Sequence, residues 1–107
     1  MSSSSVLKQF NCSLVEAVDE SLLALGEVVR RSIYQYVERN HQVEREDIPE
    51  KLEAFHKCLQ GIFGVATNVI ERLMAKRLYS KLGLSFESHE NWTLVDYVNH
   101  AKKVKGM

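Results

Sequence analysis

The sequence predicts an all-α fold, a compact bundle of four to five helices that forms one domain over residues 1–107. Apolar residues recur at helical spacings of three and four through most of the chain, and no segment alternates apolar and polar residues long enough for a convincing strand. The chain contains one proline and five glycines, so helices have few breaks. Apolar residues make up 45% and charged residues 26%, the balance of a globular domain.

The first expected helix follows a serine-rich segment, of which residues 1–4 are expected to be frayed. It starts at a serine cap at position 4 or 5 or, because Ser13 and Glu16 form a capping-box pattern, later, near Leu14. Its apolar stripe runs to about position 25 and consists of Phe10, Leu14, Val18, Leu22 and Leu25.

Gly26 decides whether the chain as far as Asn40 forms one bent helix or two. A glycine inside a helix costs about 1 kcal/mol relative to alanine, which is too little to force a break. We expect two helices. The apolar stripe of the second consists of Val29, Ile33, Tyr36 and Val37.

The charged stretch 41–47 is expected to be a loop, and a third helix is expected to begin at Asp47. The Asp47 carboxylate can accept a hydrogen bond from the Glu50 amide, while Glu50 can reach back to the Asp47 amide. Pro49 suits a first helical turn, where its missing N–H is no loss. The apolar face of this helix consists of Leu52, Phe55, Leu59 and Ile62.

Gly61 and Gly64 lie so close together that they favour either a turn or a close approach of helices. A fourth helix is expected over residues 65–82, ending at Gly83 as a C-terminal cap with Lys81 near the negative end of the helix dipole. Its expected inner face consists of Ala66, Ile70, Leu73, Met74, Leu78, Tyr79 and Leu82.

A loop over residues 84–91 precedes the last helix, which Thr93 caps with Asp96 three residues on. Trp92 and Tyr97 occupy the positions of a hydrophobic staple across this cap. The chain is expected to end in a frayed basic tail over residues 103–107.

The sequence predicts no catalytic, cofactor-binding or metal-binding residues. His56 and Cys58 are two apart, which on a helix points them about 200° apart, so they cannot chelate one ion together. We expect His56 at the surface, and both Cys12 and Cys58 as reduced thiols packed like small apolar residues. The glycines at 61 and 64 lie between helices with no lysine following, unlike a phosphate-binding loop.

The net charge is zero, but its distribution is uneven. Residues 1–53 carry six Lys/Arg against ten Asp/Glu (−4), and residues 54–107 carry eight against four (+4). We interpret this as packed helices with complementary faces, because a nucleic-acid-binding domain usually has an overall basic excess. The helix, glycine turn and helix nevertheless outline a helix-turn-helix, in which the helix over 65–82 would contact DNA or another anion through Arg72 and Lys76.

The expected function is therefore a non-enzymatic protein-interaction or regulatory module, with a DNA-binding regulator as the alternative. Two-fold pairing is the commonest assembly, so we expect a homodimer. Tyr34, Tyr36, Met74 and Trp92 are candidates for an exposed apolar patch. The sequence lacks an export signal and any apolar run near the ~20 residues of a membrane span, so we expect a cytoplasmic protein without a membrane partner.

Several short motifs follow one another in a fixed order: Leu25-Gly26-Glu27, Ile48-Pro49-Glu50, Ile62-Phe63-Gly64, Ile70-Glu71-Arg72, Leu78-Tyr79-Ser80-Lys81-Leu82-Gly83 and Asp96-Tyr97-Val98. In these motifs, which extend over about two-thirds of its length, the chain resembles a family of small archaeal helical proteins of unassigned function. The resemblance implies an archaeal, cytosolic helical bundle. Because the motifs mark helix ends and turns, it brings no active-site residues with it.

Overall fold

The computed structural model describes residues 2–107, with side chains from Ser5 onward, and this part of the chain is helical without strands. The all-α bundle predicted from the sequence is confirmed. Five α-helices and two short 3₁₀ turns follow one another: α1 (Ser2–Ala24), α2 (Glu27–His41), η1 (Arg45–Asp47), α3 (Leu52–Phe63), η2 (Gly64–Ala66), α4 (Thr67–Leu82) and α5 (Leu94–Val104).

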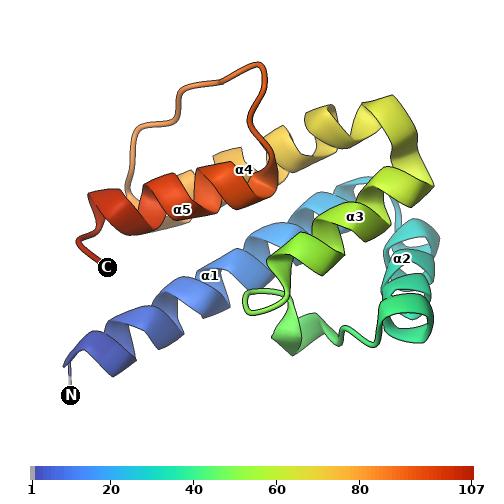
Figure 1. The fold of residues 1–107 in the computed structure, drawn as a ribbon, viewed down its shortest axis with the longest axis horizontal. Helices are drawn as coiled ribbons and strands as arrows, with labels where there is room; N and C mark the ends of the chain where they lie inside the picture. The colour runs from blue at the N-terminus through green and yellow to red at the C-terminus, as the bar shows by residue number, and fades with distance from the viewer. Residues whose placement is uncertain (1) are drawn as a thin grey trace.

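Helix α1 is the longest helix of the bundle, and α4 packs along it more extensively than any other helix does. Helix α2 turns away from the end of α1, and α3 and α5 complete the bundle (Figure 1). Both chain ends lie at one end of the long axis, whereas the α1–α2 corner and the α3–α4 corner lie at the other. The long axis extends over 36 Å.

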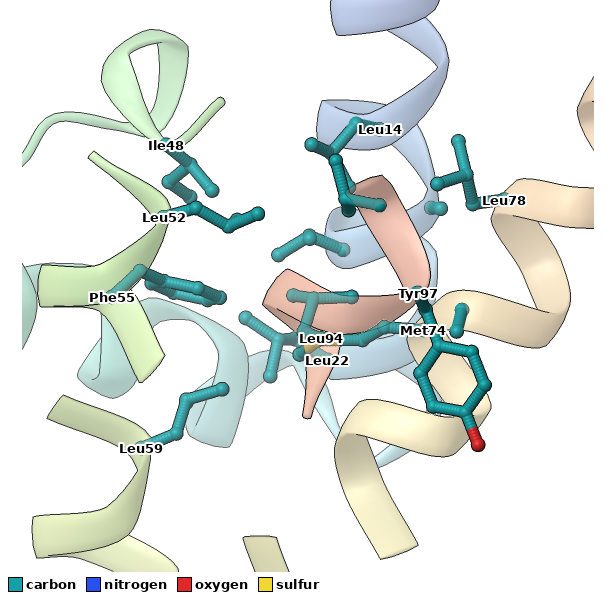
Figure 2. Packing of buried hydrophobic residues seen from close by; sticks show 14 of the residues in the cluster. Leu14, Leu22, Ile48, Leu52, Phe55, Leu59, Met74, Leu78, Leu94 and Tyr97 are labelled. Carbon is teal, nitrogen blue, oxygen red and sulfur yellow. The ribbon is translucent and has the colours of Figure 1, made fainter. Parts of the chain in front are cut away.

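All five α-helices contribute to a single core. Its centre, shown in Figure 2, includes Leu14, Leu22, Ile48, Leu52, Phe55, Leu59, Met74, Leu78, Leu94 and Tyr97. The expected stripe of α1 is buried from Phe10 to Leu22, which confirms its phase. Leu25, the last member, lies beyond the end of the helix and is exposed.

The helical conformation is interrupted at Gly26, as expected, so that α1 ends before this residue and α2 begins after it. The backbone there adopts φ 121°, a conformation that side chains other than glycine rarely take. The amides of Leu25 and Gly26 close the last turn of α1 by bonding to the carbonyls of Leu22 and Leu23. Two helices therefore replace one bent helix.

The prediction that the third helix begins at Asp47 is wrong, because α3 begins at Leu52. The Glu50 amide donates to the backbone carbonyl of Asp47 at 3.0 Å, and the expected capping box is absent from the side-chain hydrogen bonds of the described residues. A 3₁₀ turn and a further turn occupy residues 45–51, and they bring Ile48 into the core at 1% exposure. Burial of this side chain outweighs the local capping pattern.

The two glycines between α3 and α4 differ in role. Gly61 lies inside α3, and Gly64 ends that helix at φ 57° and ψ −128°. Helix α4 begins at Thr67, two residues later than expected, because Thr67 Oγ1 donates to the carbonyls of Gly64 and Leu59 (2.7 and 3.1 Å). Its buried face is also rotated from the expected one and consists of Thr67, Glu71, Met74, Ala75, Leu78 and Tyr79.

The C-terminal half otherwise follows the sequence pattern. Gly83 caps α4 in the left-handed conformation, and Thr93 forms the expected capping box with Asp96. The rings of Trp92 and Tyr97 lie 5.1 Å apart, which confirms the hydrophobic staple.

The fraying expected at the two chain ends stays a prediction. Met1 lies outside the described residues, and the bounds of α1 include residues 2–4. At the other end α5 continues to Val104, and Gly106 at φ 78° lets the Met107 amide bond to the Lys102 carbonyl at 2.8 Å. This is the hydrogen-bond pattern of a glycine C-terminal cap.

Candidate functional site

The structure brings Arg72 and Lys76 onto one outward face of α4, as the sequence predicts. Lys76 is exposed and Arg72 is half-buried, with its Nε buried and lacking a hydrogen-bond partner. The first turns of this face carry Val65, in the preceding η2 turn, and Val69. These valines are 98% and 62% exposed, so the face starts apolar where a DNA-reading helix would present polar groups.

The other basic residues of α4 are engaged within the bundle. Lys81 contacts Glu20 at 2.8 Å and Glu16 at 3.7 Å, and Arg77 contacts Glu20 at 3.7 Å. Hydrogen bonding to Glu20 raises the pKa of Lys81. The acidic first half and the basic second half of the sequence thus meet at the α1–α4 contact, which supports the interpretation of complementary faces.

Most of the exposed large apolar side chains lie toward the end of the molecule opposite the chain termini. They lie at the α1–α2 corner, on α2 and at the α3–α4 corner (Figure 1). We call this surface the apolar end. It consists of Leu23, Leu25, Val28, Val29, Tyr36, Ile62, Val65 and Val69.

Local backbone geometry explains this exposure. Gly64 ends α3 abruptly, so Val65 stands at the outside of a corner instead of on a buried helical face. A Cβ added to Gly61 would lie 3.8 Å from the Tyr36 hydroxyl, which places α2 beside the last turn of α3. Of the four residues expected to form an apolar patch, only Tyr36 belongs to the apolar end. Met74 is buried, and Tyr34 and Trp92 pack partly against the core.

The charges beside the apolar end neutralise one another. Arg30 contacts both Glu27 (2.8 Å) and Asp19 (2.9 Å), and Arg31 contacts Glu27 at 3.8 Å. Burial would raise the pKa of Asp19, but hydrogen bonds from Arg30 and Tyr34 hold it below its ordinary value. The surface therefore combines exposed apolar groups with an internally paired set of charges.

A buried histidine–glutamate pair lies elsewhere in the bundle and was not predicted. His56 Nδ1 of α3 lies 2.7 Å from Glu71 Oε2 of α4, and Glu71 Oε1 accepts a hydrogen bond from the Leu94 amide of α5 at 3.0 Å. The expectation that His56 lies at the surface is wrong, because the buried face of α3 includes it. Glu71 has no exposed surface, and this burial raises its pKa.

This pair ties three helices together. The hydrogen bonds of both side chains lie within the bundle, and they join neither cysteine. Cys58 is buried, which raises the pKa of its thiol. Cys12 is exposed, so the expectation that both thiols pack like small apolar residues is wrong for Cys12. Within residues 2–107 no group of three or more His, Cys, Asp or Glu side chains is arranged to hold a metal ion.

An aromatic cluster fixes the loop before α5. Trp92 stacks on His89 at 3.9 Å, and the Tyr97 hydroxyl bonds to both the amide and the carbonyl of His89. Tyr79 Oη donates to the Tyr97 carbonyl at 2.7 Å. A cavity of about 330 Å³ opens beside this cluster and is also lined by Ser85, Glu87 and His100. The rings are engaged with one another, so the cluster serves to hold the loop.

No family model, curated protein or solved structure matches this sequence. The resemblance to a family of small archaeal helical proteins therefore stays a prediction from the short sequence motifs. Among the helices of the described residues, none has the length and apolar character needed to span a bilayer.

Proposed function

We propose that the protein is a self-associating interaction module, which pairs with a second copy of itself through the apolar end. The observation that carries this proposal is the exposure of the α3–α4 corner, where Val65 is 98% and Val69 62% exposed. No enzymatic step is part of the proposal.

A partner at this surface would remove apolar area from water. Burying a valine side chain fully contributes roughly 1.5–3 kcal/mol, and contiguous exposed apolar patches commonly mark interaction sites. The residues of the apolar end lie at the α1–α2 corner, on α2 and at the α3–α4 corner. A partner that covers this surface would therefore contact several helices at once.

A second copy fits this surface better than a charged partner. A two-fold interface places the same patch on both sides, so any net charge would meet its own sign. Because Glu27 is paired with Arg30 and Arg31, the apolar end presents no excess of either sign to its copy. A strongly acidic or basic partner would find no complementary charge there.

Charge substitution at the corner tests the proposal. We expect the wild-type protein to sediment as a dimer at high concentration and Val65→Asp/Val69→Asp to sediment as a monomer, because a two-fold contact would bury four uncompensated carboxylates. Sedimentation velocity across a concentration series measures the change. The matched control is Val6→Asp/Val104→Asp, which alters exposed valines at the opposite end and should leave the dimer intact.

Two results would contradict pairing through the apolar end. One is a wild-type protein that stays monomeric throughout the concentration series, and the other is equal loss of the dimer in both double variants. Circular dichroism spectra and melting curves of each variant separate lost pairing from lost folding.

DNA binding through α4 is the alternative function. It draws on Arg72 and Lys76 alone, because Arg77 and Lys81 contact acidic residues of α1. Val65 and Val69 occupy the start of the face that would enter a groove. These observations favour self-association over DNA binding.

A further inference from the structure

The end of the molecule that carries both chain termini differs in character from the apolar end. There the start of α1 and the end of α5 lie side by side (Figure 1). Val6 and Phe10 line one cavity together with Lys105 and Met107, and Lys102 Nζ lies 5.8 Å from the centre of the Phe10 ring.

Exposed aliphatic groups and lysines are interspersed at this end. Val6, Val104 and Met107 are each more than two-fifths exposed. The half-buried Lys102 and the exposed Lys103 lie in the last turn of α5, and the exposed Lys105 follows that turn. We call these six residues the lysine end.

The lysine end has a single sign of charge. Residues 5–15 and 97–107 contain no aspartate or glutamate. None of the salt bridges among the described residues involves any of these three lysines. The nearest acids on α1, Glu16 and Glu20, face Lys81 and Arg77. The three ammonium groups at the end of α5 therefore lack acidic partners in the folded protein.

We propose that the lysine end docks on the surface of an anionic lipid bilayer. Lysine ammonium groups are attracted to anionic headgroups, and aliphatic side chains beside them enter the boundary between headgroups and acyl chains. Lysine also keeps its charge in water while its stem lies along apolar surface. This is a peripheral contact, and it replaces the sequence-based expectation that the protein has no membrane partner.

A bilayer fits this surface better than a nucleic acid does. Phosphate recognition favours arginine, which binds phosphate oxygens in a bidentate manner, and the lysine end contains none. Contact with the phosphate backbone of a nucleic acid would not bury the apolar side chains of Val104 and Met107, whereas insertion into a bilayer would remove them from water.

Co-sedimentation with lipid vesicles tests this proposal. We expect the protein to pellet with vesicles of phosphatidylcholine and phosphatidylserine at low ionic strength, to remain in solution with pure phosphatidylcholine vesicles, and to dissociate as salt is added. Lys103→Glu/Lys105→Glu should weaken partitioning at least about 30-fold, from two lost lysine contacts. Val104→Asp/Met107→Asp, which keeps the lysines, should also weaken it.

The matched control is Lys51→Glu/Lys57→Glu, which makes the same change of net charge at exposed positions just before α3 and within it. It should lose only a small part of the affinity. Equal loss in both lysine variants would overturn the proposal, as would the absence of binding to anionic vesicles at low salt. Tighter binding to duplex DNA than to anionic vesicles, if it is lost in Lys103→Glu/Lys105→Glu and kept in Arg72→Ala/Lys76→Ala, would assign the lysine end to nucleic acid instead. Circular dichroism checks that each variant remains folded.

Discussion

At the scale of single residues, two glycines three positions apart have opposite roles. Gly61 lies inside α3 with helical geometry, and an added Cβ would meet only the Tyr36 hydroxyl at an ordinary contact distance of 3.8 Å. Gly64 has open space around it, but its φ of 57° and ψ of −128° disfavour any side chain. At Gly61 the available space decides the effect of a substitution, whereas at Gly64 the backbone conformation decides it.

We therefore expect Gly61→Ala to stabilise the protein by up to about 1 kcal/mol, because alanine favours the helix and restricts the unfolded chain. Gly64→Ala should destabilise it by about 1 kcal/mol or more. Urea unfolding monitored by circular dichroism measures both. If both variants shifted the midpoint in the same direction, the difference in backbone conformation would not be what governs stability here.

Glu71 gives a prediction about pH. Burial raises the pKa of its carboxyl group, although hydrogen bonds from His56 and the Leu94 amide act in the opposite direction and the nearby Glu53 adds to the increase. The folded protein therefore favours protonated Glu71. This contribution to stability is fully present below the ordinary pKa of 4.5 and is lost as pH rises through the higher folded-state pKa.

Glu71→Gln removes the titration and keeps an oxygen that can accept from the Leu94 amide. We expect the stability of the wild type relative to this variant to fall as pH increases from below 4.5 toward neutrality. Paired urea titrations across this pH range measure the difference. The reverse slope would show that pairing with His56 outweighs burial and holds the pKa down.

Sequence reasoning missed this pair for a physical reason. Glu71 interrupts an apolar stripe, and a charged residue in that position favours a helix phase that points it outward. The actual phase is revealed by Thr67, Met74 and Leu78 on the same side of α4. His56 is 15 residues away in the sequence, so no local pattern connects it to Glu71.

At the scale of helices, the ends that depend on local chemistry were predictable. Gly26, Gly83 and Thr93 each act within a few residues, and each terminates or caps a helix as its sequence pattern indicates. Asp47 misled because a competing backbone acceptor and the burial of Ile48 decide the conformation there. Tertiary burial of this kind cannot be seen in a local motif.

One threonine and one aspartate substitution test the difference between a real helix cap and a capping pattern that forms no cap. Thr93→Ala should cost about 0.5–2 kcal/mol, because it leaves the Asp96 amide at the start of α5 without its cap. Asp47→Ala should change stability by no more than about 0.5 kcal/mol, because the Asp47 side chain caps no helix. Thermal unfolding of both variants compares them directly. An equal or larger effect at Asp47 would restore the capping role that the sequence indicates.

At the scale of the whole molecule, the two ends of the long axis differ in their charge. The acidic and basic halves of the sequence meet in the middle, where Glu20 of α1 contacts Arg77 and Lys81 of α4. One end carries the exposed Val65 and the paired charges at the start of α2, and the other end carries the lysines near the end of α5. The sequence revealed the charge asymmetry, but it could not assign these residues to ends because their grouping depends on where the corners fold.

The position of the two termini has a consequence for any assembly of the protein. Both lie at the end opposite the apolar end, about one 36 Å molecular length away. If two copies join at their apolar ends, their lysine ends point away from each other. Such a dimer would bridge two bilayers and hold them a fixed distance apart. Domains fused to either terminus would lie at the two ends of the dimer, far from its interface.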